Sequence, residues 1–125
     1  MKKIKAIILE PGKEAFVKEI GRDLASMQQI VGGLIQAIFP FEGEICIVVN
    51  DEGKITGLPL NRALYDENGK VYDIIAGTAV ICSCRTEHFG SITEKEQKKY
   101  LAMFKSPETF ISLGGEIIAI PIDGE

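Results

Sequence analysis

The chain has 125 residues, of which 46% are hydrophobic and 26% are charged, and its formal net charge is −4. This balance is typical of one soluble globular domain over residues 1–125 and excludes a disordered chain. No apolar run approaches the roughly 20 residues of a membrane span, and the first apolar stretch is too short for a secretory signal. Neither half has the cationic excess of a nucleic-acid surface. We therefore expect a cytoplasmic protein without membrane or direct nucleic-acid partners.

The N-terminal part contains strand, helix and strand signals in turn. Residues 3–9 predict a strand that becomes wholly apolar, and residues 15–20 predict a half-exposed strand that pairs back on it as a hairpin. Helical spacing of apolar residues predicts a helix over residues 22–31, starting at Asp23 or Gly21. Gly32-Gly33 follows this helix, which is typical of a C-cap; a phosphate cradle would precede a helix instead.

The middle of the chain is predicted to hold short strands and turns. Apolar strands are expected at residues 34–39 and 45–49, followed by a tight connection at residues 51–54 in which Gly53 can adopt a positive φ. The loop over residues 57–66 is expected to contain one helical turn, because Pro59 suits the first position of a helix. Asn68-Gly69 is a two-residue hairpin signal.

The remaining predicted elements include the clearest helix of the chain. Strands are expected at residues 71–72 and 78–83, with a bend or close backbone approach at Gly77. Thr93 and Glu96 fit a capping box, and the helix that follows would bury Tyr100, Leu101 and Phe104 and end at Ser106-Pro107. A last strand is expected over residues 115–122, at a sheet edge because it contains Pro121.

The irregular order of these elements predicts an α+β fold, with a mainly antiparallel mixed sheet and two helices against one of its faces. An uncovered last strand would allow pairing with a second copy, so a homo-oligomer is a candidate state, although Pro121 argues against a long pairing.

Four segments in series resemble one known family. They are Leu9-Glu10-Pro11-Gly12-Lys13, Val31-Gly32-Gly33-Leu34-Ile35, Gly57-Leu58-Pro59-Leu60-Asn61-Arg62-Ala63-Leu64 and Asp73-Ile74-Ile75-Ala76-Gly77-Thr78. In this order and spacing they resemble the domain of unknown function family numbered 3846, from Ile4 to about Cys82. The resemblance implies a small accessory protein of phages and mobile genetic elements of Gram-positive bacteria, with host or rival defence systems as expected targets. It implies no activity and no catalytic residue.

The richest candidate site is the loop over residues 57–72, with Arg62 as its leading residue. A guanidinium on a rigid turn could hold a phosphate or carboxylate at two points, while Asn61 beside it bonds a base or amide edge. The structural alternative has Asn61 cap the short helix and Arg62 pair with Asp66 four residues later.

Tyr65, Tyr72 and Asp73 complete the candidate site. The two tyrosines could stack on a planar ligand, but amphipathic side chains at strand ends need no ligand to explain them. Asp73 could position Arg62 or act as a base, yet one carboxylate without a partner does not specify acid–base chemistry.

The cysteines and the single histidine indicate neither a metal site nor a nucleophile pair. Cys46, Cys82 and Cys84 are expected to be reduced thiols in apolar surroundings. Zinc sites favour Cys-x2–4-Cys spacing with further ligands, whereas Cys82 and Cys84 are separated by one residue, and we expect their thiols not to converge without a bulge. His88 lies in a polar loop, so no metal and no cofactor are predicted.

Three functional hypotheses follow from these residues. The first is a non-enzymatic domain that binds a host or element protein, or a small anionic ligand, through the loop over residues 57–72. The alternative is a binder or small hydrolase of a nucleotide-like molecule, with Arg62 on phosphate and a tyrosine on the base. The third is a purely structural accessory protein.

Overall fold

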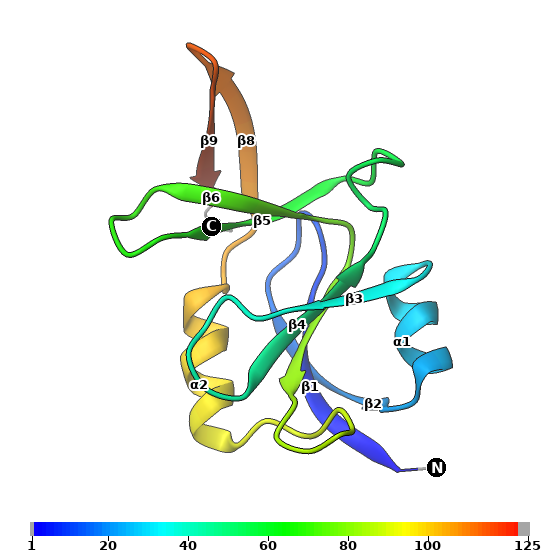
Figure 1. Cartoon of the computed structure of the whole chain (residues 1–125). Helices are drawn as coiled ribbons and strands as arrows, with labels where there is room; N and C mark the ends of the chain where they lie inside the picture. Colours follow the sequence, from blue (N-terminus) through cyan, green and yellow to red (C-terminus); the bar gives the residue numbers. More distant parts are fainter. Residues whose placement is uncertain (1, 123–125) are drawn as a thin grey trace.

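The structure is a computed structural model that describes residues 2–122. Within this part of the chain, nine strands and two helices form an α+β fold with one five-stranded sheet and two separate two-stranded sheets (Figure 1). The predicted fold class is confirmed. None of the helices among residues 2–122 is long and apolar enough to cross a membrane.

The five-stranded sheet is antiparallel at every pairing of its described strands. Its order is β2 (Phe16–Gly21), β1 (Lys3–Leu9), β7 (Ala79–Ser83), β4 (Ile45–Asn50) and β3 (Ile35–Ile38). The predicted hairpin of the first two strands is confirmed, and the central strands are the apolar ones. The expected sheet was mainly antiparallel and mixed, whereas every pair of neighbouring strands in this sheet is antiparallel.

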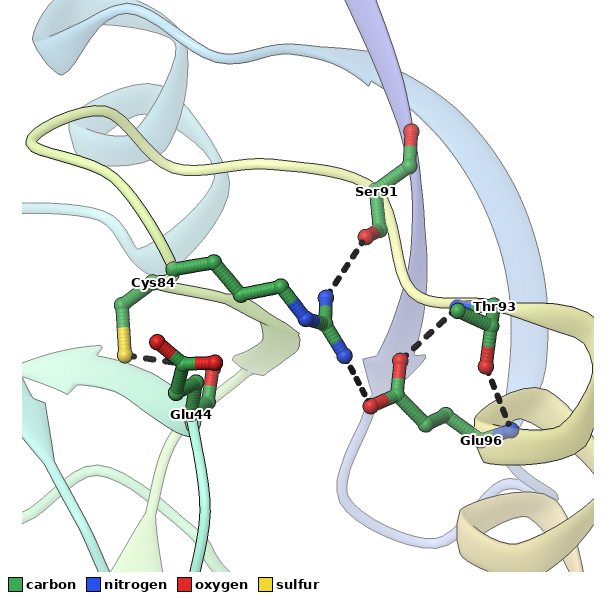
Figure 2. A network of polar contacts seen from close by, with 6 residues as sticks. Glu44, Cys84, Ser91, Thr93 and Glu96 are labelled. Atoms are coloured by element: carbon green, nitrogen blue, oxygen red, sulfur yellow. Dashed lines mark hydrogen bonds and ion pairs between the residues drawn. The ribbon is translucent and has the colours of Figure 1, made fainter.

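Both helices begin and end through local capping. In α1 (Leu24–Val31) the Asp23 side chain accepts from the Ser26 N–H, and Gly32 ends the helix with a φ of 81°. This left-handed backbone suits glycine, because it has no Cβ to clash. In α2 (Glu94–Met103) the hydroxyl of Thr93 accepts from the Glu96 N–H and the Glu96 carboxylate accepts from the Thr93 N–H, as Figure 2 shows. The predicted caps of both helices are confirmed.

The two helices cover opposite faces of the five-stranded sheet (Figure 1). Ile7 and Ile8 are neighbours on β1, yet Ile7 belongs to the core cluster of α2 and Ile8 to that of α1. Because successive residues of a strand point to opposite faces, apolar runs in β1, β4 and β7 build a core on each side. The expectation that both helices pack on one face was wrong for this reason.

A hairpin of β5 (Leu60–Tyr65) and β6 (Val71–Ala76) lies across one end of the sheet (Figure 1). The helical turn expected after Pro59 is therefore wrong: the segment is a strand with four consecutive buried residues. The hairpin signal at Asn68-Gly69 is confirmed, but the loop is longer than two residues. The Asp66 N–H donates to the Lys70 carbonyl at 2.8 Å, and Gly69 has a φ of 79°.

Two glycines allow the β5–β6 hairpin to pack closely on its neighbours. A Cβ on Gly53 would lie 2.8 Å from the Ala76 carbonyl oxygen, and one on Gly77 would lie 2.7 Å from a methyl carbon of Leu58. Gly77 has a φ of 83°, whereas Gly53 is not among the glycines with positive φ. The bend at Gly77 is confirmed. Gly53 serves close packing of the backbone rather than the positive φ expected from the sequence.

A second hairpin, β8 (Glu108–Leu113) with β9 (Glu116–Pro121), projects away from the body (Figure 1). The expected last strand is confirmed as β9, while the sequence analysis placed no strand over β8. Glu108 joins this hairpin to the first one, because its carboxylate accepts from the Ala63 N–H at 2.7 Å and from the Tyr65 hydroxyl at 3.0 Å. The Glu108 carboxylate on β8 therefore links the second hairpin to β5 of the first.

The capping box predicts a measurable loss of stability in Thr93→Ala. Without the hydroxyl, the Glu96 N–H loses its partner, and we expect the free energy of unfolding to fall by about 1 kcal/mol. Urea denaturation measures this change. Thr93→Ser keeps the hydroxyl and should remain within a few tenths of a kcal/mol of the parent; an equal loss in both variants would contradict the capping role.

Candidate binding site

Asn61 and Arg62 lie in the protein interior, with exposed fractions of 0% and 1%. The amide nitrogen of Asn61 donates to the carbonyls of Leu9 and Gly77, both at 2.8 Å. Its oxygen accepts from the Arg62 guanidinium at 2.9 Å. Asn61 thus connects the end of β1, the bend after β6 and the neighbouring arginine.

The Arg62 guanidinium is held mainly by backbone carbonyls from distant parts of the chain. Its Nε donates to Phe104 O at 3.1 Å, and one terminal nitrogen donates to Lys13 O at 2.7 Å. The other terminal nitrogen reaches Glu10 O at 3.5 Å. Burial lowers the pKa of Arg62, and the charge of Glu108 opposes this shift. The carbonyls compensate for the lost water, so this cation fixes three segments together.

Neither sequence-based reading of Asn61 and Arg62 describes their positions. Asn61 caps no helix, because the segment is a strand, and the Arg62 guanidinium donates to backbone carbonyls and to Asn61 rather than to Asp66. The expectation that the loop presents both groups outward was also wrong. The physical reason is that Arg62 finds partners 42 to 52 residues away, which local spacing cannot indicate.

Tyr65, Tyr72 and Asp73 lie at the surface, as expected for binding residues. Tyr65 and Tyr72 have exposed fractions of 46% and 53%. Burial, and then the hydrogen bond and charge of Glu108, raise the pKa of Tyr65 to about 12. Its phenol is therefore a hydrogen-bond donor at neutral pH, already engaged with a carboxylate.

A groove of about 700 Å³ lies between the two hairpins. Its apolar lining comes from β5, β6 and β9, and its polar lining includes two lysines and a tyrosine. The principal lining residues are Lys54, Leu60, Lys70, Tyr72, Ile74 and Ile117. Tyr72 and Asp73, two residues expected from the sequence, line this groove, whereas the lysines and Ile117 were not expected, since nothing in the chain shows that residues 54 and 117 meet at one groove.

The Asp73 carboxylate contacts the edge of β6 and Lys54, and it does not position Arg62. Its Oδ1 accepts from its neighbour, the Ile74 N–H, at 2.8 Å and from the Lys54 ammonium group. A carboxylate that occupies an outward N–H leaves less of the strand edge for pairing with another chain. The groove is therefore better suited to side-chain contacts at this point than to the addition of a strand along β6.

A second cavity of about 320 Å³ lies beside the first hairpin, between it and the end of α2. Tyr65, Met103 and Glu108 contribute to its wall, and Tyr72 lines both this cavity and the larger groove. The structure thus brings the two tyrosines to one cavity and places Tyr72 and Asp73 along the other. Tyr72 therefore lines both hollows.

Cys46 and Cys82 are buried on the α1 side of the five-stranded sheet, and Cys84 is partly buried beside them. The sulfurs of Cys46 and Cys82 face each other across β4 and β7 at 3.8 Å, and Cys84 packs against the core cluster that contains both. The expectation that Cys82 and Cys84 diverge was wrong, because residues two apart on a strand share a face. Hydrogen bonding to Cys46 raises the pKa of the Cys82 thiol, and burial raises that of Cys84. Cys82 and Cys84 are therefore protonated thiols at neutral pH, whereas the same hydrogen bond lowers the pKa of Cys46.

The remaining polar residues near the cysteines have structural partners. The Cys84 thiol donates to the Glu44 carbonyl at 3.3 Å, as Figure 2 shows. Arg85 forms an ion pair with Glu96. His88 lies in an exposed loop, 3.9 Å from Glu87. Over residues 2–122, no group of three or more His, Cys, Asp and Glu side chains is placed to hold a metal ion.

The fold defines a small α+β protein with a helix on each face of an antiparallel sheet and two hairpins at one end. The chain belongs to the family described as Domain of unknown function (DUF3846), whose model matches residues 4–105. The match ends before β8, so the projecting β8–β9 hairpin lies outside the matched part. No curated protein and no solved structure matches the chain.

The carbonyl contacts of Arg62 predict a large loss of stability in Arg62→Ala. The substitution leaves buried carbonyls without donors and opens a cavity, so we expect the free energy of unfolding to fall by roughly 3 kcal/mol in urea denaturation. Arg85→Ala is the matched control, because its ion pair with Glu96 lies nearer the surface and should be worth less than about 1 kcal/mol. Equal losses in both would contradict the anchoring role.

The Tyr65–Glu108 contact predicts a pH dependence above neutrality. Because the folded-state pKa of Tyr65 is about 12 and its ordinary value is 10.0, the protonated phenol stabilises the fold below pH 10.0, and this contribution is lost as the pH rises toward 12. The absorbance difference between the parent and Tyr65→Phe should titrate near pH 12. In Glu108→Gln the same difference should move toward pH 10.0; an unchanged midpoint would exclude Glu108 as a cause.

Proposed function

We propose that this chain is a cytoplasmic, non-catalytic binding module that takes a partner protein at the groove between its two hairpins. The leading contact is Tyr72, which lines both the groove of about 700 Å³ and the cavity of about 320 Å³. A half-exposed tyrosine that lines two hollows can insert its ring between partner side chains, and tyrosine is enriched among residues that dominate binding energy.

The composition of the groove supports an extended partner segment with apolar side chains. Leu60, Ile74 and Ile117 supply aliphatic surface, while Lys54 and Lys70 supply polar groups that fix orientation. Sites that combine an apolar lining with a few placed polar groups are typical of specific recognition. Asp73 contributes through its contacts with Lys54 and Ile74, which hold this side of the groove in place.

The same geometry disfavours the nucleotide-like alternative. That hypothesis needs the Arg62 guanidinium on a phosphate, but this group is 1% exposed and donates to internal carbonyls. Freeing it would break the contacts that join the first hairpin to the end of α2. Asn61 and Arg62 therefore act in this proposal as positioning residues, and Tyr65 and Tyr72 as contact residues.

The family resemblance indicates the kind of partner protein that this module would bind. Members of the family resembled by the four sequence segments occur in phages and mobile elements, so the proposed partner is a host protein or another protein of the element. A counter-defence role fits a small module that works by occupying a partner rather than by chemistry.

The proposal predicts that Tyr72→Ala removes a partner while the fold persists. In affinity purification from the native host with mass spectrometry, we expect the proteins retained by the parent chain to be lost or reduced about tenfold, the effect of one strong contact residue. Phe39→Ala is the matched control, because Phe39 is an aromatic with 61% exposure that lines neither cavity, and it should retain the partner.

The result is decided by comparison of the variants. Loss in Tyr72→Ala with retention in Phe39→Ala supports the groove as the binding site. Retention in both variants, with unchanged unfolding free energies, overturns the proposal. A nucleotide panel in a thermal-shift assay tests the alternative, and stabilisation of the parent by several degrees would favour it.

A further inference from the structure

The β8–β9 hairpin carries an aliphatic face that no other described part of the chain covers. The register pairs Ile111 with Ile118 and Thr109 with Ile120, so these residues share one face of the hairpin. Large aliphatic residues occupy most of this face, with exposed fractions from 37% to 63%. They are Ile111, Leu113, Ile118, Ile120 and Ile122. We call these five residues the aliphatic face.

The other face of the hairpin is the one turned to the rest of the chain. Glu108 on that face binds Ala63 and Tyr65, and Phe110 and Ala119 are partly covered. Ile117, also on that face, lines the groove between the hairpins. None of the five residues of the aliphatic face lines the proposed binding groove, although Glu116 beside them does, so this face requires a separate explanation.

A two-stranded hairpin with one uncovered aliphatic face is an incomplete layer. Such hairpins gain independent stability when a further layer or additional strands pack on them. The five side chains expose roughly 400 Å², comparable to the largest apolar patch on a typical monomer, which is often functional. The same side of the hairpin carries one charged residue beside these five, Glu116 at the tip, on a chain with 26% charged residues.

We infer that a second copy of this chain covers the aliphatic face, forming a two-fold dimer through the β8–β9 hairpins. A two-fold contact brings the same patch of each copy together, so a neutral aliphatic face complements itself. Complete burial of the two faces would remove about 800 Å² of aliphatic surface, two thirds of the roughly 1,200 Å² at which specific interfaces begin, so flanking residues supply the rest of the contact.

The charges at the two ends of the hairpin favour an antiparallel arrangement of the copies. Glu116 is exposed at the tip, and Lys105 is exposed just before β8 at the base. When two hairpins pack face to face in opposite directions, each tip lies over the base of the other, so opposite charges approach. A parallel arrangement would bring the two Glu116 carboxylates together instead. The pair Ile111–Ile118 then lies at the centre, next to the same pair of the partner copy.

The oligomeric state of the full chain in solution tests this inference. Sedimentation equilibrium over a dilution series should give twice the mass of one chain for the parent. Ile118→Lys and Ile118→Glu should each give the mass of one chain and weaken the dimer at least about tenfold, because each buries a charge beside its symmetry mate. Mixed in equal amounts, the two variants should recover the dimer, since lysine then meets glutamate.

Two controls separate this result from unfolding and from a general loss of apolar surface. Circular dichroism should show that both Ile118 variants keep the fold of the parent. Ile55→Lys changes an isoleucine that is 85% exposed on another turn and should remain dimeric. A parent chain that has the mass of one copy throughout the series, or a dimer that survives both Ile118 substitutions, overturns the inference. Both outcomes leave the groove proposal standing, because Ile118 does not line the groove that contains Tyr72.

Discussion

The Arg62 guanidinium joins parts of the chain that are far apart in sequence: the turn after β1, the strand β5 and the end of α2. Its Nε donates to Phe104 O, at the end of a helix whose last turn holds no basic residue of its own. Carbonyls at a helix C-terminus carry partial negative charge, so a cation from another strand stabilises this end. Lys13 O completes the contact on the turn. The hairpin that borders the groove is thereby fixed to the body.

Two further polar side chains, Asn61 and Glu108, continue the contacts of Arg62 toward the surface. Asn61 holds the end of β1 and the bend at Gly77, while Glu108 accepts from both Ala63 and Tyr65. The buried contacts of Asn61 and Arg62 and the contacts of Glu108 all involve residues of β5. They therefore fix the two hairpins relative to each other. A groove between hairpins held in this way is preorganised, which reduces the ordering cost of binding a partner.

The candidate site was only partly predictable from the sequence. Tyr72 and Asp73 follow the Asn68-Gly69 turn, and their place at a surface hairpin could be expected from turn chemistry. Arg62 was misjudged, because arginine is rarely buried and its carbonyl partners lie on segments that fold back from elsewhere. Ile117 and Lys54 could not be assigned to the groove for a related reason: they meet Tyr72 only after both hairpins have folded.

Features that depend on neighbours within a few residues could be predicted from the order of amino acids. The cap of α1 at Asp23, the capping box of α2 at Thr93 and the left-handed glycine at Gly32 follow from local hydrogen bonds and backbone freedom. Tertiary structure alone decided which face each helix covers, that residues 60–65 form a strand, and that Arg62 turns inward. These outcomes depend on which distant apolar faces and unpaired carbonyls become neighbours, and that information is absent from any local window of the chain.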